Sequence, residues 1–180
     1  MSRGQTDHSF LADKIALRLS MLPNKKVLNV IDAYSGWGSI WNNIQKKHDG
    51  KIKITKIDKE QKDDTFVLLG DNRKFLASLP LSKYDIIDLD AYGVPYHQLK
   101  ILLERKFKGI VFVTFIQSVM GQLPYEFLND LGYADTMIKK CQTLFNRNGY
   151  KKLLQWLGNN GIDRITIRKD SRKCYLGFNL

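Results

Sequence analysis

Short apolar runs alternate with stretches of helical periodicity along the first two thirds of the chain. The apolar runs predict strands over residues 27–33, 52–57, 65–69, 84–89 and 109–115. Apolar residues spaced by three or four positions predict helices over residues 39–48, 72–79 and 96–106. Strands without polar alternation, separated by helices, are typical of a parallel sheet covered on both faces.

Both ends of the chain depart from this alternation. Near the start, leucine and isoleucine recur at helical spacing and predict a helix over residues 9–22, with Ser9 as its cap. Near the end, a helix over 149–160 is followed by two strands, 162–168 and 174–179, whose linker has hairpin length. We therefore predict an α/β fold with a Rossmann-like, doubly wound, seven-stranded sheet, mostly parallel, with a C-terminal antiparallel hairpin.

The length of 180 residues fits one domain, and we predict a single domain over residues 1–180. It would include an N-terminal helical segment (1–24) and an irregular, substrate-side segment (116–148). Neither a signal-peptide core nor an apolar run that spans a bilayer is present in the sequence, so we expect no membrane association. Cys141 and Cys174 form no CxxC motif, which favours reduced thiols and a cytoplasmic location.

The formal net charge is +11, and it is unevenly distributed. Residues 136–180 contain ten Lys or Arg and two Asp, which gives +8 and leaves +3 for the rest. Such asymmetry favours a polyanionic partner, with nucleic acid as the first candidate. The basic residues that we predict to contact phosphates are Lys139, Lys140, Arg147, Lys151 and Lys152.

Acidic residues follow successive predicted strands: Asp32, Asp58, Asp71, Asp88 and Asp90. Ligands of open α/β sheets bind at the carboxyl ends of the strands, so these residues would face one ligand. Gly36 and Gly38 form a turn after the first strand, where glycine permits positive φ and close approach of a ligand. Ser39 is expected to cap the next helix.

Two further residue groups fit a nucleoside. Asp58 lies 20 residues beyond Gly38, where a strand-end carboxylate accepts from ribose hydroxyls. Asp71 and Asn72 are placed to accept from an adenine amino group, although Asp71 also fits a helix cap. Trp41 stands where a dinucleotide-binding G-x-G-x-x-G motif would have its third glycine, which counts against a nicotinamide-dependent oxidoreductase.

These features together resemble the class I S-adenosylmethionine-dependent methyltransferases over about residues 27–180. The resemblance implies S-adenosylmethionine as the cofactor and predicts that it binds to the residues of the four strand ends. These are Asp32, Tyr34, Gly36, Gly38, Asp58, Asp71, Asn72 and Asp88.

The fourth strand end, Asp88-Leu-Asp90-Ala-Tyr92-Gly93, resembles the Asp-Pro-Phe/Tyr-Gly motif of tRNA guanine-N2 dimethyltransferases. The resemblance implies that Asp90 accepts from a target amino group and that Tyr92 stacks on a base. It favours RNA over DNA as the substrate. Ala91 departs from the motif, where proline is expected. The sequence also permits a methyltransferase of a small molecule or protein, or an inactive nucleic-acid-binding module. It predicts no metal site and leaves the oligomeric state open.

Overall fold

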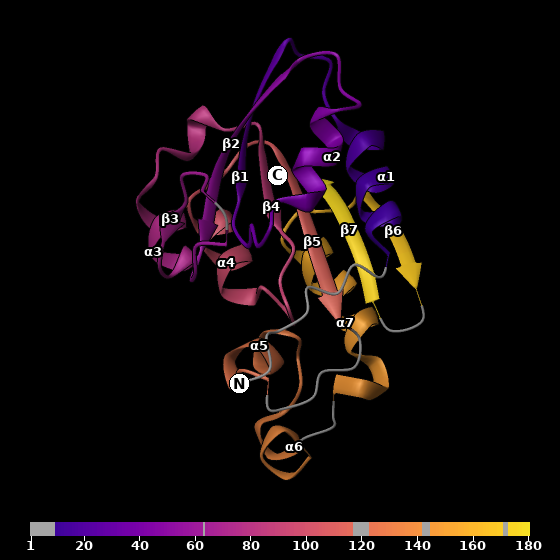
Figure 1. Cartoon of the computed structure of the whole chain (residues 1–180). Helices are drawn as coiled ribbons and strands as arrows, with labels where there is room; N and C mark the ends of the chain where they lie inside the picture. The colour runs from indigo at the N-terminus through magenta and orange to yellow at the C-terminus, as the bar shows by residue number, and fades with distance from the viewer. Residues whose placement is uncertain (1–9, 63, 117–122, 142–144, 171–172) are drawn as a thin grey trace.

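The computed structural model describes residues 10–62, 64–116, 123–141, 145–170 and 173–180 (Figure 1). Their strands form one seven-stranded sheet with the order β3-β2-β1-β4-β5-β7-β6. The strands are β1 (Val27–Asp32), β2 (Lys51–Asp58), β3 (Leu68–Leu69), β4 (Ile86–Leu89), β5 (Ile110–Ile116), β6 (Ile165–Asp170) and β7 (Lys173–Asn179). Neighbours from β3 to β5 are parallel, whereas β7 is antiparallel to both β5 and β6. The predicted fold class is confirmed.

Helices cover both faces of the sheet (Figure 1). The helices are α1 (Leu11–Met21), α2 (Ser39–Gln45), α3 (Asn72–Ser78), α4 (Tyr96–Glu104), α5 (Tyr125–Asp130), α6 (Asp135–Lys140) and α7 (Phe145–Asn159), with a 3-10 turn η1 (Leu81–Lys83). Side chains of α1 and α2 pack in one apolar cluster, and those of α3 to α7 pack in the other. The strands are apolar on both sides because each face is buried under helices.

Alternation along β4 shows how one strand serves both clusters. Ile86 packs with α1 and α2, whereas Ile87 and Leu89 pack with the helices of the opposite face. Asp88 points to the same side as Ile86, because side chains alternate along a strand. This places a fully buried carboxylate under α1 and α2.

The sequence predicts an irregular segment over 116–148, but its described residues (116, 123–141 and 145–148) are mostly helical. It contains α5, α6 and the beginning of α7. Two of these helices have only six residues, so they complete fewer than two turns and leave little periodicity to recognise. Several of their apolar residues, among them Phe127 and Ile138, are buried in the larger cluster.

Several predicted element ends also change. The third strand is reduced to Leu68–Leu69. Helix α2 has Gly38 at its cap position, with no side-chain cap, so Ser39 is the first helical residue instead of the cap. Phe10, with φ of 70°, precedes α1, and the predicted cap Ser9 lies outside the described residues. No helix in the described ranges combines the length and apolar character needed to cross a membrane.

Candidate functional site

The carboxyl ends of the parallel strands bring the predicted acidic residues to one edge of the sheet. Asp32 at the end of β1 is in register with Asp88 on β4. Asp58 ends β2, and Asp90 follows β4 directly. We refer to this side of the sheet as the carboxyl edge.

The glycine turn between β1 and α2 has the conformation that its sequence requires. Gly36 and Gly38 have φ of 50° and 68°, values that L side chains rarely adopt. No atom lies within 4 Å of the position that a Cβ of Gly36 would take, so the turn leaves open space there. The hydroxyl of Ser35 beside it is buried and has no hydrogen-bond partner among the described residues. The turn therefore offers both space and an unused polar group.

Asp58 connects this turn to the end of β2. The N–H of Gly36 donates to Asp58 Oδ2 at 2.7 Å, and the N–H groups of Lys59 and Glu60 donate to Oδ1 at 2.7 and 3.2 Å. The carboxylate thus fixes the glycine turn relative to β2. It is half-buried, and a carboxylate has about four acceptor positions, so one remains for a ligand hydroxyl.

Amide groups connect the glycine turn to the third strand end. Asn72 Nδ2 donates to the carbonyl of Ala33 at 2.9 Å, and Gln98 Nε2 donates to Asn72 Oδ1 at 2.7 Å. Tyr34 is also hydrogen-bonded to Asn72, and burial raises the pKa of the Tyr34 hydroxyl. Tyr34 and Asn72 therefore belong to one hydrogen-bonded network, and their contact with a cofactor stays a prediction.

Asp71 serves as the cap of α3, which was the alternative reading of its sequence position. Its carboxylate accepts from the N–H of Arg73 at 2.9 Å and pairs with the Arg73 guanidinium at 2.6 Å. These hydrogen bonds from Arg73 lower the pKa of Asp71 to about 2. Contact of Asp71 with an adenine amino group stays a prediction. For that contact, the Asp71 carboxylate would have to accept a hydrogen bond from the amino group in addition to those from Arg73.

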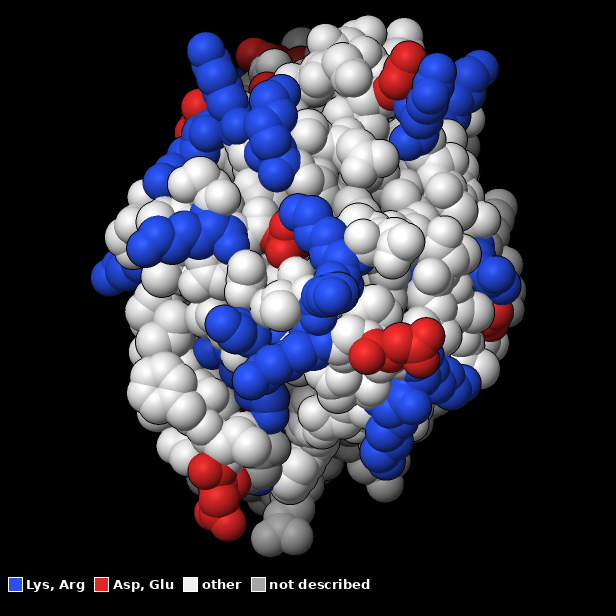
Figure 2. Space-filling model, turned by 90° about the horizontal axis from the view of Figure 1, so that it is seen from above, with Lys and Arg blue, Asp and Glu red and all other residues white. Residues whose placement is uncertain are grey.

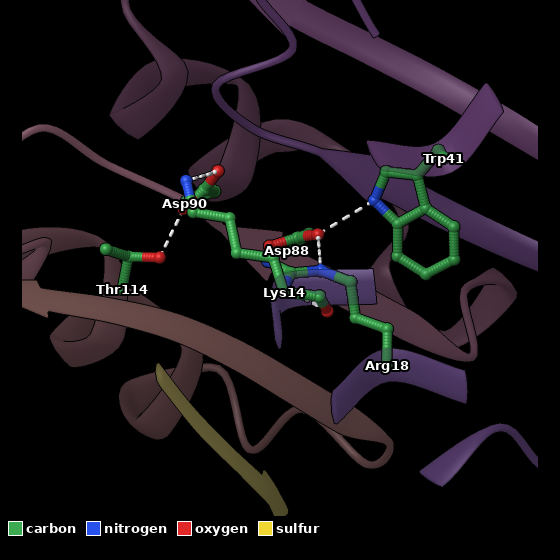
Figure 3. A network of polar contacts seen from close by, with 6 residues as sticks. All are labelled: Lys14, Arg18, Trp41, Asp88, Asp90 and Thr114. Atoms are coloured by element: carbon green, nitrogen blue, oxygen red, sulfur yellow. Dashed lines mark hydrogen bonds and ion pairs between the residues drawn. The ribbon is translucent and has the colours of Figure 1, made fainter. Parts of the chain in front are cut away.

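Asp88 is the centre of a buried polar network (Figure 3). Arg18 of α1 donates from Nε and Nη2 to its two carboxylate oxygens, each at 2.6 Å. Trp41 of α2 adds a hydrogen bond from Nε1 to Oδ2 at 2.8 Å. The side chains of Arg18 and Asp88 are each only 1% exposed. The contacts of Asp88 therefore join α1 and α2 to the sheet, and its predicted contact with a cofactor stays a prediction.

Asp90 is held by the same helix one turn away (Figure 3). Lys14 Nζ donates to Asp90 Oδ2 at 2.7 Å, and the Thr114 hydroxyl donates to Oδ1. Burial opposes ionisation of Asp90, but the positive charges of Arg18 and Lys14 outweigh it and lower the pKa of Asp90. Asp90 is thus a carboxylate anchored on both oxygens, with acceptor positions to spare.

Asp32 has the opposite electrostatic environment. Burial raises the pKa of Asp32 well above its usual range, and the nearby carboxylates of Asp88 and Asp90 raise it further. Arg18 and the backbone N–H of Tyr34 act in the other direction without reversing the shift. Burial and two neighbouring carboxylates thus favour the protonated form of Asp32, whereas the pKa of Asp90 is lowered.

We expect Asp32→Asn to stabilise the protein at pH 8. The contribution of Asp32 to stability is complete below its unfolded pKa of about 4 and is lost as pH rises through its raised folded pKa. Asparagine resembles the protonated acid and cannot ionise. Urea unfolding should therefore give a higher midpoint than wild type at pH 8, with the difference shrinking towards pH 4. Equal midpoints at pH 8 would contradict the assignment, and Asp64→Asn, at an exposed position, is the control.

Tyr92 and Ala91 form the turn after Asp90. Tyr92 is 76% exposed, as a stacking residue requires. Ala91 is buried, and its N–H donates to the carbonyl of Leu89 at 2.8 Å. Proline has no N–H and could not donate this hydrogen bond. The turn after Asp90 is therefore stabilised by a backbone hydrogen bond that a proline at position 91 would remove.

The predicted phosphate contacts have different surroundings. Lys139, Lys140 and Lys151 are exposed. Lys152 is half-buried, its ammonium donates to the carbonyls of Leu131 and Gly132, and it also lies over the Tyr133 ring. Arg147 belongs to α7, but its side chain lies outside the described residues.

Sequence reasoning missed Lys14, Arg18, Trp41 and Thr114. One signal was present: Arg18 follows Ile15 by three positions, so a charge falls on the apolar stripe of α1. A charged residue in such a stripe indicates a buried ion pair. Its partner was not readable, because Arg18 and Asp88 are 70 positions apart. The described residues contain no cluster of potential metal ligands.

Comparison with known proteins gives similarity in fold only. No protein-family model and no curated protein sequence matches the chain. Similar solved structures include a SAM-dependent methyltransferase from Archaeoglobus fulgidus, with a TM-score of 0.55 and 12% identity over 97% of both chains. A putative ribosomal RNA methyltransferase from Plasmodium falciparum has a TM-score of 0.51 and 18% identity, also over 97% of both chains.

A third similar structure is TrmK of M. capricolum in complex with S-adenosyl-homocysteine. It has a TM-score of 0.53 and 13% identity, over 92% of this chain and 67% of that one. Identities this low show the fold and nothing finer. The chain thus has the Rossmann-like, seven-stranded fold found in SAM-dependent methyltransferases.

Proposed function

We propose that this protein is an S-adenosylmethionine-dependent methyltransferase that modifies an exocyclic amino group of a base in nucleic acid, with RNA favoured over DNA. The observation that carries the proposal is the hydrogen bond from the N–H of Gly36 to the carboxylate of Asp58. It joins a glycine turn with positive φ to a carboxylate at the next strand end, in a fold that SAM-dependent methyltransferases share.

The residues at this edge fit the cofactor. The open space at Gly36 would admit it, and the unpartnered Ser35 hydroxyl would gain a hydrogen-bond partner. Asp58 would accept from one ribose hydroxyl, and the network of Tyr34 and Asn72 would border the adenine. When bound, the cofactor supplies an electrophilic methyl group on a sulfonium.

Asp90 would orient the target amine instead of removing its proton. Lys14 and Arg18 keep its pKa low against the effect of burial, which makes it a weak base but a good hydrogen-bond acceptor. Lys14 and Thr114 occupy about half of its acceptor positions, so amine N–H groups have room to bind. Tyr92 would stack on the base, since its ring is exposed. The proton of the methylated amine would leave to solvent.

A second candidate is a nucleic-acid-binding module without catalysis on the same fold. The observation that favours it is the ion pair between Lys14 and Asp90, which places an ammonium group of the chain itself on the proposed acceptor. In this case the protein would bind RNA, but no methyl group would be transferred.

Calorimetric titration with S-adenosylmethionine, S-adenosylhomocysteine and NAD tests the proposal. We expect the first two to bind and NAD not to bind. Binding of NAD alone would overturn the proposal. Binding of S-adenosylmethionine without transfer of radiolabelled methyl to total RNA or DNA would favour the second candidate or a methyltransferase of a small molecule or protein.

We expect Asp58→Ala to weaken cofactor binding by at least about tenfold, because it removes the proposed ribose acceptor and also frees the glycine turn. Calorimetry on the folded variant measures the change. Glu60→Ala, two residues away at an exposed position, is the matched control. An unchanged affinity in Asp58→Ala combined with a loss in Glu60→Ala would move the ribose contact to Glu60.

A further inference from the structure

The opposite edge of the sheet, where the parallel strands begin, is rich in lysine. We call it the amino edge. Lysines occur in the residues that lead into or begin four neighbouring strands of the sheet (β2, β1, β4 and β5) and within β2 itself. They are Lys25, Lys26, Lys46, Lys47, Lys51, Lys53, Lys83, Lys106 and Lys108, all exposed. Figure 2 shows this edge from above, with Lys and Arg side chains spread across it and few acidic ones.

These lysines are mostly free of acidic partners. Lys25 pairs with Asp85 at 2.6 Å. For the other eight, the described part of the chain provides no ion pair. At the carboxyl edge, in contrast, Lys14, Arg18 and Arg73 each pair with an aspartate. Eight lysines without an ion pair in the described part of the chain therefore lie together at the edge opposite the proposed cofactor site.

Helix ends explain only part of this distribution. Helices α2 and α4 run back from the carboxyl edge, so their C-termini lie at the amino edge and favour nearby cations. That accounts for Lys46, Lys47 and Lys106, which follow these helices. It does not account for Lys25, Lys26, Lys83 and Lys108, which lead into β1, β4 and β5, or for Lys51 and Lys53, which lie within β2.

The amino edge also has a hollow of about 530 Å³. Lys53 and Lys83 are among its lining residues, together with hydrogen-bonding groups of Asn29, Thr55 and Tyr84. The Thr55 and Tyr84 hydroxyls lie 3.1 Å apart and form a hydrogen bond. The surface thus combines two ammonium groups with neutral polar groups in a concavity, a combination that suits a phosphate and its sugar.

We propose that the amino edge is a second nucleic-acid-binding surface, which contacts the backbone of an RNA at a distance from the modified base. The inference rests on the proposed function for the identity of its partner. Strand β2 has eight residues and so separates the two edges by roughly 25 Å. A short oligonucleotide bound at one edge does not reach the other. The surface therefore selects for a folded RNA that is large enough to contact both.

Fluorescence anisotropy with a labelled RNA hairpin of about 20 base pairs, between about 50 and 200 mM KCl, tests this surface without cofactor. In the amino-edge variant, Lys46, Lys51, Lys83 and Lys108 become Gln. Each lost phosphate contact should lower the slope of log affinity against log salt by about 0.9. We expect the dissociation constant to rise at least about tenfold at low salt. The control variant changes Lys74, Lys100, Arg164 and Arg168 to Gln, an equal charge change at surface positions outside the amino edge and outside the residues assigned to the cofactor or to phosphates.

The proposal requires the amino-edge variant to lose affinity while the control stays within about twofold of wild type. Equal losses would show an effect of net charge and overturn it, as would unchanged binding or the absence of RNA binding by wild type. If a labelled polyglutamate peptide bound the wild type as tightly as the RNA does, and lost the same affinity in the amino-edge variant, the surface would be assigned to acidic proteins instead. Titration with S-adenosylmethionine, run separately, distinguishes failure of this surface from failure of the cofactor site.

Discussion

Arg18→Leu is expected to lower the free energy of unfolding by about 3–5 kcal/mol, the largest stability effect of any single change considered for this protein. Arg18 donates two hydrogen bonds to Asp88, and both side chains are almost completely buried. Removing the guanidinium leaves a carboxylate under α1 and α2, with Trp41 as its remaining side-chain donor among the described residues. The cost comes mainly from that uncompensated buried charge. Urea unfolding monitored by circular dichroism measures it.

Two further variants separate this effect from simple loss of contact. Lys25→Ala removes an ion pair at the surface, whose lysine is 56% exposed, and should cost no more than about 1 kcal/mol. The double variant Arg18→Leu with Asp88→Asn removes both charges and keeps an acceptor for Trp41. It should recover a large part of the loss, because neutral groups are less costly to bury. A double variant as unstable as the sum of the two single variants would contradict the interpretation.

Asp90→Asn is expected to reduce methyl transfer by at least about 100-fold while cofactor affinity stays within a few-fold. The change preserves shape and removes the charge that would orient the target amine. The new amide would also present donor groups to Lys14 or Thr114, the two residues that now donate to Asp90. Transfer of radiolabelled methyl to RNA and calorimetric titration with S-adenosylmethionine measure the two quantities separately.

Asp85→Asn is the matched control for Asp90→Asn. Asp85 is also a partly buried aspartate that pairs with a lysine, but it lies at the amino edge. It should leave the transfer rate unchanged. Normal methylation by Asp90→Asn would show that the fourth strand end was assigned incorrectly. A loss of both transfer and cofactor binding, with an unchanged unfolding midpoint, would place Asp90 in the cofactor site instead.

Much of the fold was predictable because it follows from local pattern. Apolar runs such as those of β1 and β5 indicate buried strands, and the hairpin-length linker before Lys173 indicates the antiparallel end of the sheet. The six-residue helices α5 and α6 were not predictable, because fewer than two turns are too short to show the helical repeat of apolar residues. The sites of α5 and α6 are defined by packing against the larger cluster, which depends on residues far away in the chain.

At the candidate site, the acidic residues at strand ends and the glycine turn could be read from the order of residues, because both depend only on neighbouring residues and on the parallel order of the strands. The partners of each carboxylate became known only from the folded chain. Asp88 accepts hydrogen bonds from Arg18 and Trp41. Asp90 accepts one from Lys14, and Asp58 accepts one from the N–H of Gly36 in the glycine turn. These partners lie between 22 and 76 positions away. The strength of hydrogen bonding and the pKa of a carboxylate depend on distance in space and on burial, and a one-dimensional pattern contains neither.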